Sequence, residues 1–123
     1  VNGGKQKRCF TYISDGIDCL MKILQNKKEI CNKQIFNIGN PDNEASIKQL
    51  AQILITLYKE EYGQNIESKI IVKKENEFYG DGYQDIYHRK PSIRKVKKLL
   101  GWKPTVSLED SISLTFKNYK HAL

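Results

Sequence analysis

The sequence predicts a mixed α/β fold in which helices dominate, and two observations carry this prediction. Short runs rich in Phe, Tyr, Thr, Ile and Val, which are typical of strands, alternate with longer segments whose apolar residues recur at helical spacing. The chain has 123 residues, of which 39% are hydrophobic, enough for one domain with a modest core. The predicted order is strand, helix, strand, helix, strand, long loop, helix, helix, without an internal repeat.

The first predicted strand is "KQKRCFTYI" (5–13), which is rich in aromatic and β-branched residues. A helix over 14–26 follows, because Ser14 or Asp15 can accept the free N–H groups of a helix start. Four apolar residues fall on one face of this helix: Ile17, Leu20, Met21 and Leu24. The short apolar run "QIFNIG" (34–39) predicts a second strand that stops at Gly39, and "NPDNEAS" (40–46) predicts a turn or loop.

The clearest helix covers residues 46–63. Ser46 and Gln49 are spaced as in a capping box, and Gly63 suits the end of the helix. Its apolar residues recur at helical spacing: Ile47, Leu50, Ala51, Leu54, Leu57 and Tyr58.

The second half begins with "SKIIVKK" (68–74), a predicted strand, and continues with "ENEFYGDGYQDIYHRK" (75–90), an extended loop with a short pairing segment. A helix is then predicted from Ser92 to Gly101. A last helix is predicted over 107–123, with Ser107 as its cap and Asp110 at the box position. Between these two helices, Trp102 suits a core position better than a stacking platform.

The charge of the chain suits an anionic partner. Twenty-one Lys and Arg residues against 14 Asp and Glu residues leave a net charge of +7. Nucleotides, nucleic acid or anionic lipid would complement this charge, although plain solubility explains it equally well.

The cysteine, histidine and hydropathy patterns argue against a disulfide-rich, a metal-binding and a membrane-spanning protein. Cys9, Cys19 and Cys31 are odd in number and form no CxxC pair, which indicates thiols of a reducing compartment rather than a disulfide framework. His88 and His121 have no partners at ligand spacing, so no metal site is expected. No run of 18 apolar residues and no signal peptide is visible, so a cytoplasmic location is expected.

The opening "VNGGKQKRCF" has no initiator Met, and "GG" before a strand-like run resembles the end of a hairpin whose first strand is missing. We therefore expect a fragment of a longer protein.

Three segments in order resemble one protein family. "GGKQKRCFTYISDGIDCL", "FNIGNPDNEASIKQLAQIL" and "RKPSIRKVKKLLGWKPTVSLEDSI" are similar to motifs in the C-terminal half of extended short-chain dehydrogenases that act on nucleotide sugars. The resemblance covers nearly the whole chain. It implies that residues 1–123 form a single partial domain, the C-terminal UDP-sugar-binding lobe, in which a small sheet and flanking helices fold back over a Rossmann core that is missing here.

Within that family, "GGKQKRCFT", "NIGNP" and "HRKPSIR" are most similar to the UDP-glucuronate oxidative decarboxylase part of bifunctional polymyxin-resistance proteins. This resemblance implies oxidation of the sugar C4 by NAD, followed by loss of CO2 to give a UDP-4-keto-pentose in the lipid A aminoarabinose pathway. Epimerases, 4,6-dehydratases and UDP-xylose synthases share the lobe and stay possible. Whether a formyltransferase domain precedes the lobe is left open.

Two motifs of the family are absent. The sequence has no TGxxGxxG fingerprint, and none of its seven tyrosines has a lysine four residues later. Both motifs belong to the N-terminal, NAD-binding half in the resembled family. We therefore expect no cofactor-binding residue in this chain, and we expect the chain by itself to be inactive. The parent enzyme is expected to be a homo-oligomer.

Arg89 is the candidate catalytic residue. A guanidinium can hold a carboxylate with two hydrogen bonds and stabilise the enolate that forms when a β-keto acid loses CO2. By resemblance, the arginine of "HRKPS" is the proton donor, although a free arginine keeps its proton. The alternative is an arginine that merely pairs with an acid such as Asp85.

Substrate contacts are expected at two places. By resemblance, Tyr83 contacts the substrate through its phenol, although a loop aromatic packed on the core is the alternative. The opening segment resembles the family's UDP-sugar-binding strand and comprises Val1, Asn2, Gly3, Gly4, Lys5, Gln6, Lys7 and Arg8. Its glycines allow close backbone approach and its cations suit a diphosphate. Alternation puts Gln6 and Arg8 on one face, although a solvated basic edge strand would look the same.

Two other residues have simpler explanations: a helix cap accounts for Asp15, and Ser92 is a cap rather than a nucleophile. Two rival functions remain. A small basic nucleic-acid-binding module fits the charge, but the lysines are spread over several elements and no recognition motif is present. A ligand-free interaction segment fits the missing Rossmann half.

Overall fold

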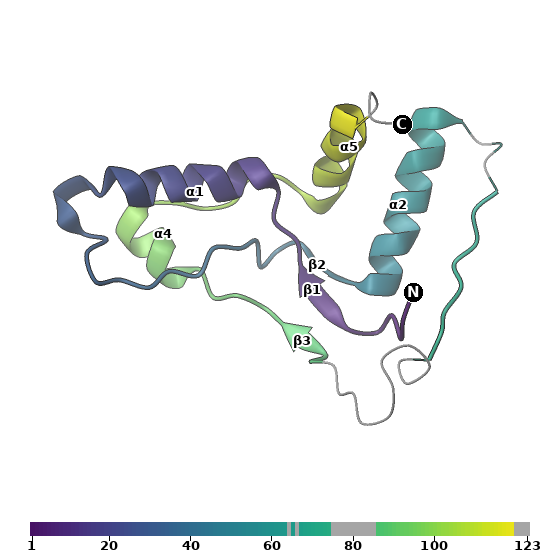
Figure 1. The fold of residues 1–123 in the computed structure, drawn as a ribbon, viewed down its shortest axis with the longest axis horizontal. Helices are drawn as coiled ribbons and strands as arrows, with labels where there is room; N and C mark the ends of the chain where they lie inside the picture. Colours follow the sequence, from purple (N-terminus) through teal and green to yellow (C-terminus); the bar gives the residue numbers. More distant parts are fainter. Residues whose placement is uncertain (64, 66, 75–85, 120–123) are drawn as a thin grey trace. The chain divides into compact units, whose positions relative to one another are not determined.

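The computed structural model describes residues 1–63, 65, 67–74 and 86–119 and confirms the predicted α/β class (Figure 1). The elements follow in chain order: β1 (Lys7–Cys9), α1 (Ile13–Gln25), a 3-10 turn (Lys27–Glu29), β2 (Glu44–Ser46), α2 (Ile47–Tyr62), β3 (His88–Arg89), α4 (Arg94–Leu100) and α5 (Leu108–Tyr119). The three strands form one sheet in the order β2-β1-β3. No helix in the described part of the chain is long and apolar enough to cross a membrane.

The chain folds as two compact units. The first unit comprises Val1–Arg8, Ala45–Arg89 and Ile112–Leu123, and the second comprises Cys9–Glu44 and Lys90–Ser111. The segments of each unit are far apart in the sequence, so each unit depends on long-range contacts.

In the first unit, α2 begins and ends as its sequence predicts. The Ser46 hydroxyl accepts a hydrogen bond from the Gln49 backbone N–H at 3.1 Å, and the Gln49 side chain accepts one from the Ser46 N–H at 2.9 Å. The helix stops at Gly63. Aromatic contacts hold α2 against α5: the Tyr58 and Phe116 ring centroids lie 5.6 Å apart, and the Tyr62 hydroxyl donates to the Phe116 carbonyl oxygen.

The second unit has a small core of Cys19, Val96 and Trp102, each at most 1% exposed. Five apolar side chains pack around this core: Ile23, Phe36, Ile38, Ile93 and Leu100. The indole N–H of Trp102 donates to the Asp15 carbonyl oxygen at 3.1 Å, so this large side chain is buried with its polar atom satisfied. The prediction that Trp102 is a core residue is confirmed.

The interpretation of Asp15 as a helix cap is wrong. Helix α1 begins at Ile13, and its N-cap is Tyr12, which makes no side-chain cap hydrogen bond. Asp15 lies inside the first turn, is buried, and accepts hydrogen bonds from the N–H groups of Thr105 and Val106 and from the Thr105 hydroxyl, all at 3.0–3.1 Å. Its carboxylate thus satisfies a turn 90 residues away in the sequence.

Ser92 is also not a cap. Helix α4 begins at Arg94 after an Ile93 N-cap that makes no side-chain hydrogen bond, and the Ser92 hydroxyl accepts instead from Arg94 Nε. The predicted cap of the last helix is confirmed, because the Asp110 N–H donates to the Ser107 hydroxyl at 3.0 Å.

The strands are the elements for which the structure differs most from the sequence-based prediction. Residues 34–39 form no strand, residues 44–46 of the predicted loop form β2, and 68–74 contributes only a parallel bridge between Lys73 and Asn2. A strand requires a neighbour for its backbone hydrogen bonds, which local composition does not supply. The short pairing segment expected within 75–90 corresponds to β3.

Candidate functional site

The opening segment of the chain is held on two sides within the first unit. Its first residues lie beside residues 71–73: the Gly3 N–H donates to the Lys73 carbonyl at 2.9 Å, and the Lys73 N–H donates to the Val1 carbonyl at 3.0 Å. Further along, the carbonyls of Gly4 and Gln6 accept from the first N–H groups of α2. The segment is therefore an ordered surface, and it brings in Lys73, which the sequence analysis did not single out.

Gly3 and Gly4 are required by the backbone. Both have positive φ angles, 64° and 83°, which favour glycine. A Cβ added to Gly4 would lie 2.9 Å from Val1 Cγ1 and 3.3 Å from Lys48 Cβ. The close approach at Gly4 is thus to the chain's own side chains.

Strand register places Arg8 next to Arg89. Strands β1 and β3 pair in parallel, with Lys7 opposite His88 and Arg8 opposite Arg89. Paired residues on neighbouring strands point to the same face, and the strands lie about 4.8 Å apart. Two arginines that are 81 positions apart in the sequence therefore start from adjacent points on one side of the sheet.

The two guanidiniums have different surroundings. Arg8 is half-buried, and its Nη1 donates to the carbonyls of Ile86 at 2.7 Å and Lys7 at 2.8 Å, which draws the side chain toward the β3 segment. Arg89 is exposed, and none of the described residues forms a hydrogen bond or ion pair with its side chain. The Arg89 side chain is thus exposed to solvent, whereas the neighbouring Arg8 side chain is held by two backbone carbonyls.

Gln6 adds an unsatisfied polar atom to the same segment. The side chain is 8% exposed, and its Nε2 donates to the Asn2 carbonyl at 2.9 Å. Its Oε1 is buried, and no described residue donates a hydrogen bond to it. A buried carbonyl oxygen without a donor costs free energy, so this position favours a ligand N–H or O–H.

The structure therefore brings most of the predicted site residues together in the first unit, namely Val1–Arg8 and Arg89. Tyr83 and the alternative partner Asp85 lie outside the described residues. Among the described residues, no group of three or more His, Cys, Asp or Glu side chains could hold a metal ion.

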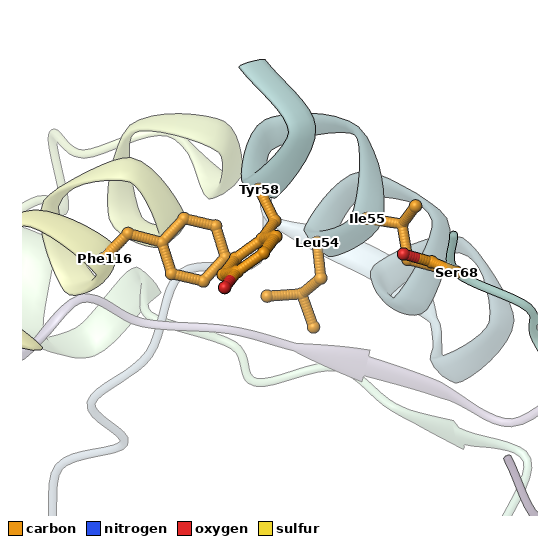
Figure 2. A pocket seen from close by; sticks show the side chains of 5 residues that line it. All are labelled: Leu54, Ile55, Tyr58, Ser68 and Phe116. Carbon is orange, nitrogen blue, oxygen red and sulfur yellow. The ribbon is translucent and has the colours of Figure 1, made fainter. Parts of the chain in front are cut away.

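Two pockets of the first unit do not suit a charged ligand as well as the opening segment does. Figure 2 shows an apolar pocket of about 250 Å³ lined by Leu54, Ile55, Tyr58, Ser68 and Phe116. Among these described lining residues, only Ser68 and Tyr58 offer polar side-chain groups, which does not match a diphosphate. A pocket of about 410 Å³ is lined by Lys59, Glu67, Ser68 and Lys69, where a carboxylate accompanies the two cations.

Known structures share this fold. The PbgP3 protein from Burkholderia pseudomallei matches with a TM-score of 0.78 and 30% identity over 98% of this chain and 34% of its own. A variant of UDP-glucuronic acid 4-epimerase from Bacillus cereus, in complex with UDP-4-deoxy-4-fluoro-glucuronic acid and NAD, matches with a TM-score of 0.77 and 25% identity, covering 99% and 34%. RMD from Pseudomonas aeruginosa, complexed with NADPH, matches in fold alone, with a TM-score of 0.76 and 14% identity over 100% and 36%.

The fold is thus shared with nucleotide-sugar epimerases and dehydratases of the extended short-chain dehydrogenase class, of which the Bacillus cereus epimerase is an example. Residues 1–115 match the family described as GDP-mannose 4,6 dehydratase, and the chain belongs to that family. The chain spans about a third of the length of the structures it matches.

Proposed function

We propose that Val1–Arg8 and Arg89 form the substrate-binding part of an NAD-dependent UDP-glucuronate decarboxylase that oxidises the sugar at C4 and releases a UDP-4-keto-pentose. The observation that supports this proposal is the registered pair of Arg8 and Arg89. Like charges directly opposite each other on paired strands repel, and anionic groups between or beyond them relieve that repulsion. UDP-glucuronate carries such groups at two points, the diphosphate and the sugar carboxylate.

Within this proposal each residue has a distinct role. Arg8 and the lysines of the opening segment, Lys5 and Lys7, contact the diphosphate. Gln6 Oε1 accepts a hydrogen bond from the nucleoside, while Val1, Asn2, Gly3 and Gly4 present backbone groups to the ligand. Tyr83 is proposed as a further substrate contact.

Arg89 holds the sugar carboxylate and acts in the chemical step. When the β-keto acid loses CO2, the bond between C5 and the carboxyl carbon breaks and its electron pair remains on the sugar as an enolate. The guanidinium stabilises that negative charge, and C5 then takes up a proton, which Arg89 donates in our proposal. NAD would supply oxidation at C4, but this chain carries no glycine-rich phosphate-binding motif, so its residues do not fit that cofactor.

The proposal implies a wider setting. The parent enzyme would be a cytoplasmic homo-oligomer with an N-terminal NAD-binding half, and it would serve lipid A aminoarabinose synthesis and polymyxin resistance. A second candidate, a UDP-glucuronate 4-epimerase, is favoured by the Bacillus cereus structure at 25% identity. An epimerase would bind the same substrate through these residues without releasing CO2.

Calorimetric titration of the chain with UDP-glucuronate and UDP-glucose tests the binding site. Arg89→Met should weaken UDP-glucuronate about tenfold or more, the value of one charge-assisted hydrogen bond, and should change UDP-glucose less than about threefold. Arg8→Met should weaken both ligands, because both carry the diphosphate. Arg94→Met in the second unit removes the same charge and should change neither.

Two results would reject the assignment. Equal effects of Arg89→Met on the two sugars would remove Arg89 from the carboxylate. Salt-sensitive binding of an oligonucleotide, without saturable binding of either UDP-sugar, would favour the nucleic-acid module. Release of CO2 by the complete enzyme, lost in Arg89→Met, separates the decarboxylase from the epimerase.

A further inference from the structure

Two cavities of the first unit adjoin at Ser68. The apolar chamber is the pocket of about 250 Å³ in Figure 2, lined by Leu54, Ile55, Tyr58, Ser68 and Phe116. The charged chamber is the pocket of about 410 Å³ lined by Lys59, Glu67, Ser68 and Lys69. Because Ser68 lines both, an apolar space and a charged space lie next to each other, which is the arrangement that an amphipathic ligand requires.

The apolar chamber has aromatic walls. The ring centroids of Tyr58 and Phe116 lie 5.6 Å apart with an angle of 81° between the ring planes, which is an edge-to-face arrangement. A third ring in such a setting gains aromatic contacts beyond the burial of its surface. A cavity of about 150 Å³ holds benzene, so the apolar chamber has room for a larger aromatic ring system.

The charged chamber suits a ligand with a single negative charge. Lys59 is half-buried and follows Tyr58 directly on α2, so this cation lies at the border with the aromatic wall. None of the described residues forms an ion pair with the ammonium groups of Lys59 or Lys69. Two cations and the Glu67 carboxylate leave one positive charge, which a carboxylate balances. A phosphate group, with a charge of about −1.5 to −2, would add excess negative charge beside Glu67.

We propose that the apolar and charged chambers together form a binding site for a small aromatic carboxylate. The ring of the ligand packs against Tyr58, Phe116 and Leu54. Its carboxylate accepts charge-assisted hydrogen bonds from Lys59 and Lys69. None of the residues that line this site belongs to the proposed UDP-sugar surface, so the inference goes beyond the proposed function and does not depend on it.

Calorimetric titration of the chain with 2-naphthoate tests the site without any nucleotide. We expect saturable binding with a dissociation constant below about 1 mM. Two related probes separate the contributions of ring and charge. The neutral 2-naphthamide keeps the ring system, octanoate keeps the carboxylate, and each should bind at least about threefold more weakly than 2-naphthoate. An excess of UDP-glucuronate should leave the affinity for 2-naphthoate unchanged.

Three variants locate the ligand within the site. Lys59→Met should weaken 2-naphthoate about tenfold and should change 2-naphthamide less than about threefold. Lys117→Met removes the same charge from an exposed position of α5 outside the two chambers and should change neither probe. Leu54→Trp fills the apolar chamber and should weaken both probes about tenfold or more. Nuclear Overhauser effects between 2-naphthoate and the methyl groups of Leu54 and Ile55 in the wild type locate the ring even if Leu54→Trp does not fold.

Several results would overturn the proposal. Equal weakening by Lys59→Met and Lys117→Met would attribute binding to the overall positive charge of the chain. Octanoate binding as tightly as 2-naphthoate would reject an aromatic ligand, and displacement by UDP-glucuronate would assign 2-naphthoate to the opening segment. The site itself would be rejected by a lack of saturable binding up to about 10 mM, or by Overhauser effects confined to other methyl groups such as those of Ile71 and Val72. None of these results except displacement involves a UDP-sugar, so a failure here is distinguishable from a failure of the proposed function.

Discussion

Replacing Asp15 with alanine tests the second unit at a buried carboxylate that accepts several hydrogen bonds. The Asp15 carboxylate is buried and receives hydrogen bonds from the Thr105 N–H, the Thr105 hydroxyl and the Val106 N–H. Hydrogen bonds to a charged acceptor contribute about 1.5–3 kcal/mol each, and donors left buried without an acceptor add to the loss. Allowing for non-additivity and for water reaching the turn, we expect Asp15→Ala to lower the free energy of unfolding by about 3–5 kcal/mol.

The size of the loss in free energy of unfolding distinguishes two roles for Asp15, a helix cap and a buried hydrogen-bond acceptor. Loss of a helix cap costs about 1 kcal/mol, so a cap and a buried network differ severalfold. Asp15→Asn keeps the shape of the side chain and one acceptor oxygen, but its amide NH₂ group faces hydrogen-bond donors. This variant should lower the free energy of unfolding by about 2 kcal/mol. Asp18→Ala, at an exposed position of the same helix, should change the free energy of unfolding by less than about 0.5 kcal/mol.

Urea denaturation followed by tryptophan fluorescence measures these differences. Trp102 is the single tryptophan of the chain and is buried in the same unit, so its signal reports that unit specifically. A loss below about 1.5 kcal/mol for Asp15→Ala, or a loss equal to that of Asp18→Ala, would refute the network as a determinant of stability.

Three further predictions follow from other positions. Gly4→Ala should lower the free energy of unfolding by about 1–3 kcal/mol, because Gly4 has a φ of 83° and an added Cβ would lie 2.9 Å from Val1 Cγ1. Gly16→Ala, where an added Cβ would have no atom within 4 Å, should leave that free energy unchanged or raise it by up to about 1 kcal/mol. Equal shifts of the two variants in thermal denaturation would contradict this prediction. Ser46→Ala removes the capping box and should lower the free energy of unfolding by about 1 kcal/mol. Denaturation followed by circular dichroism measures this loss, and an unchanged free energy would show that the box is dispensable. Burial raises the pKa of the Cys19 thiol above its usual value, so its contribution to stability is complete below the unfolded pKa and is lost as pH rises through the folded pKa. The urea midpoint should therefore fall more between about pH 8 and 10 in the wild type than in Cys19→Ala, and parallel falls would exclude this linkage.

Local signals in the sequence were sufficient for several elements. The helix over 46–63 was predicted with its capping box and its Gly63 end, because those interactions join residues three or four positions apart. The cap at Ser107 is confirmed for the same reason. Trp102 was recognised as a core residue from its size and setting alone.

The candidate site was predictable residue by residue but not as an arrangement. The opening segment and Arg89 were singled out by resemblance, whereas the register that sets Arg89 opposite Arg8 joins positions 81 apart. The same holds for Lys73, whose place beside Val1 and Gly3 depends on a long-range bridge.

By itself the sequence determined the α/β class and the bounds of its strongest helix, since these follow from periodicity, capping and composition. The cations proposed to contact the ligand were singled out by resemblance alone. Only the tertiary structure decided which strands pair, that Asp15 supports a distant turn instead of capping a helix, and that α1 leaves its most apolar face exposed. The physical reason is that strand pairing, buried hydrogen bonds and the choice of packed face depend on partners that are far away in the chain, and no local pattern specifies those partners.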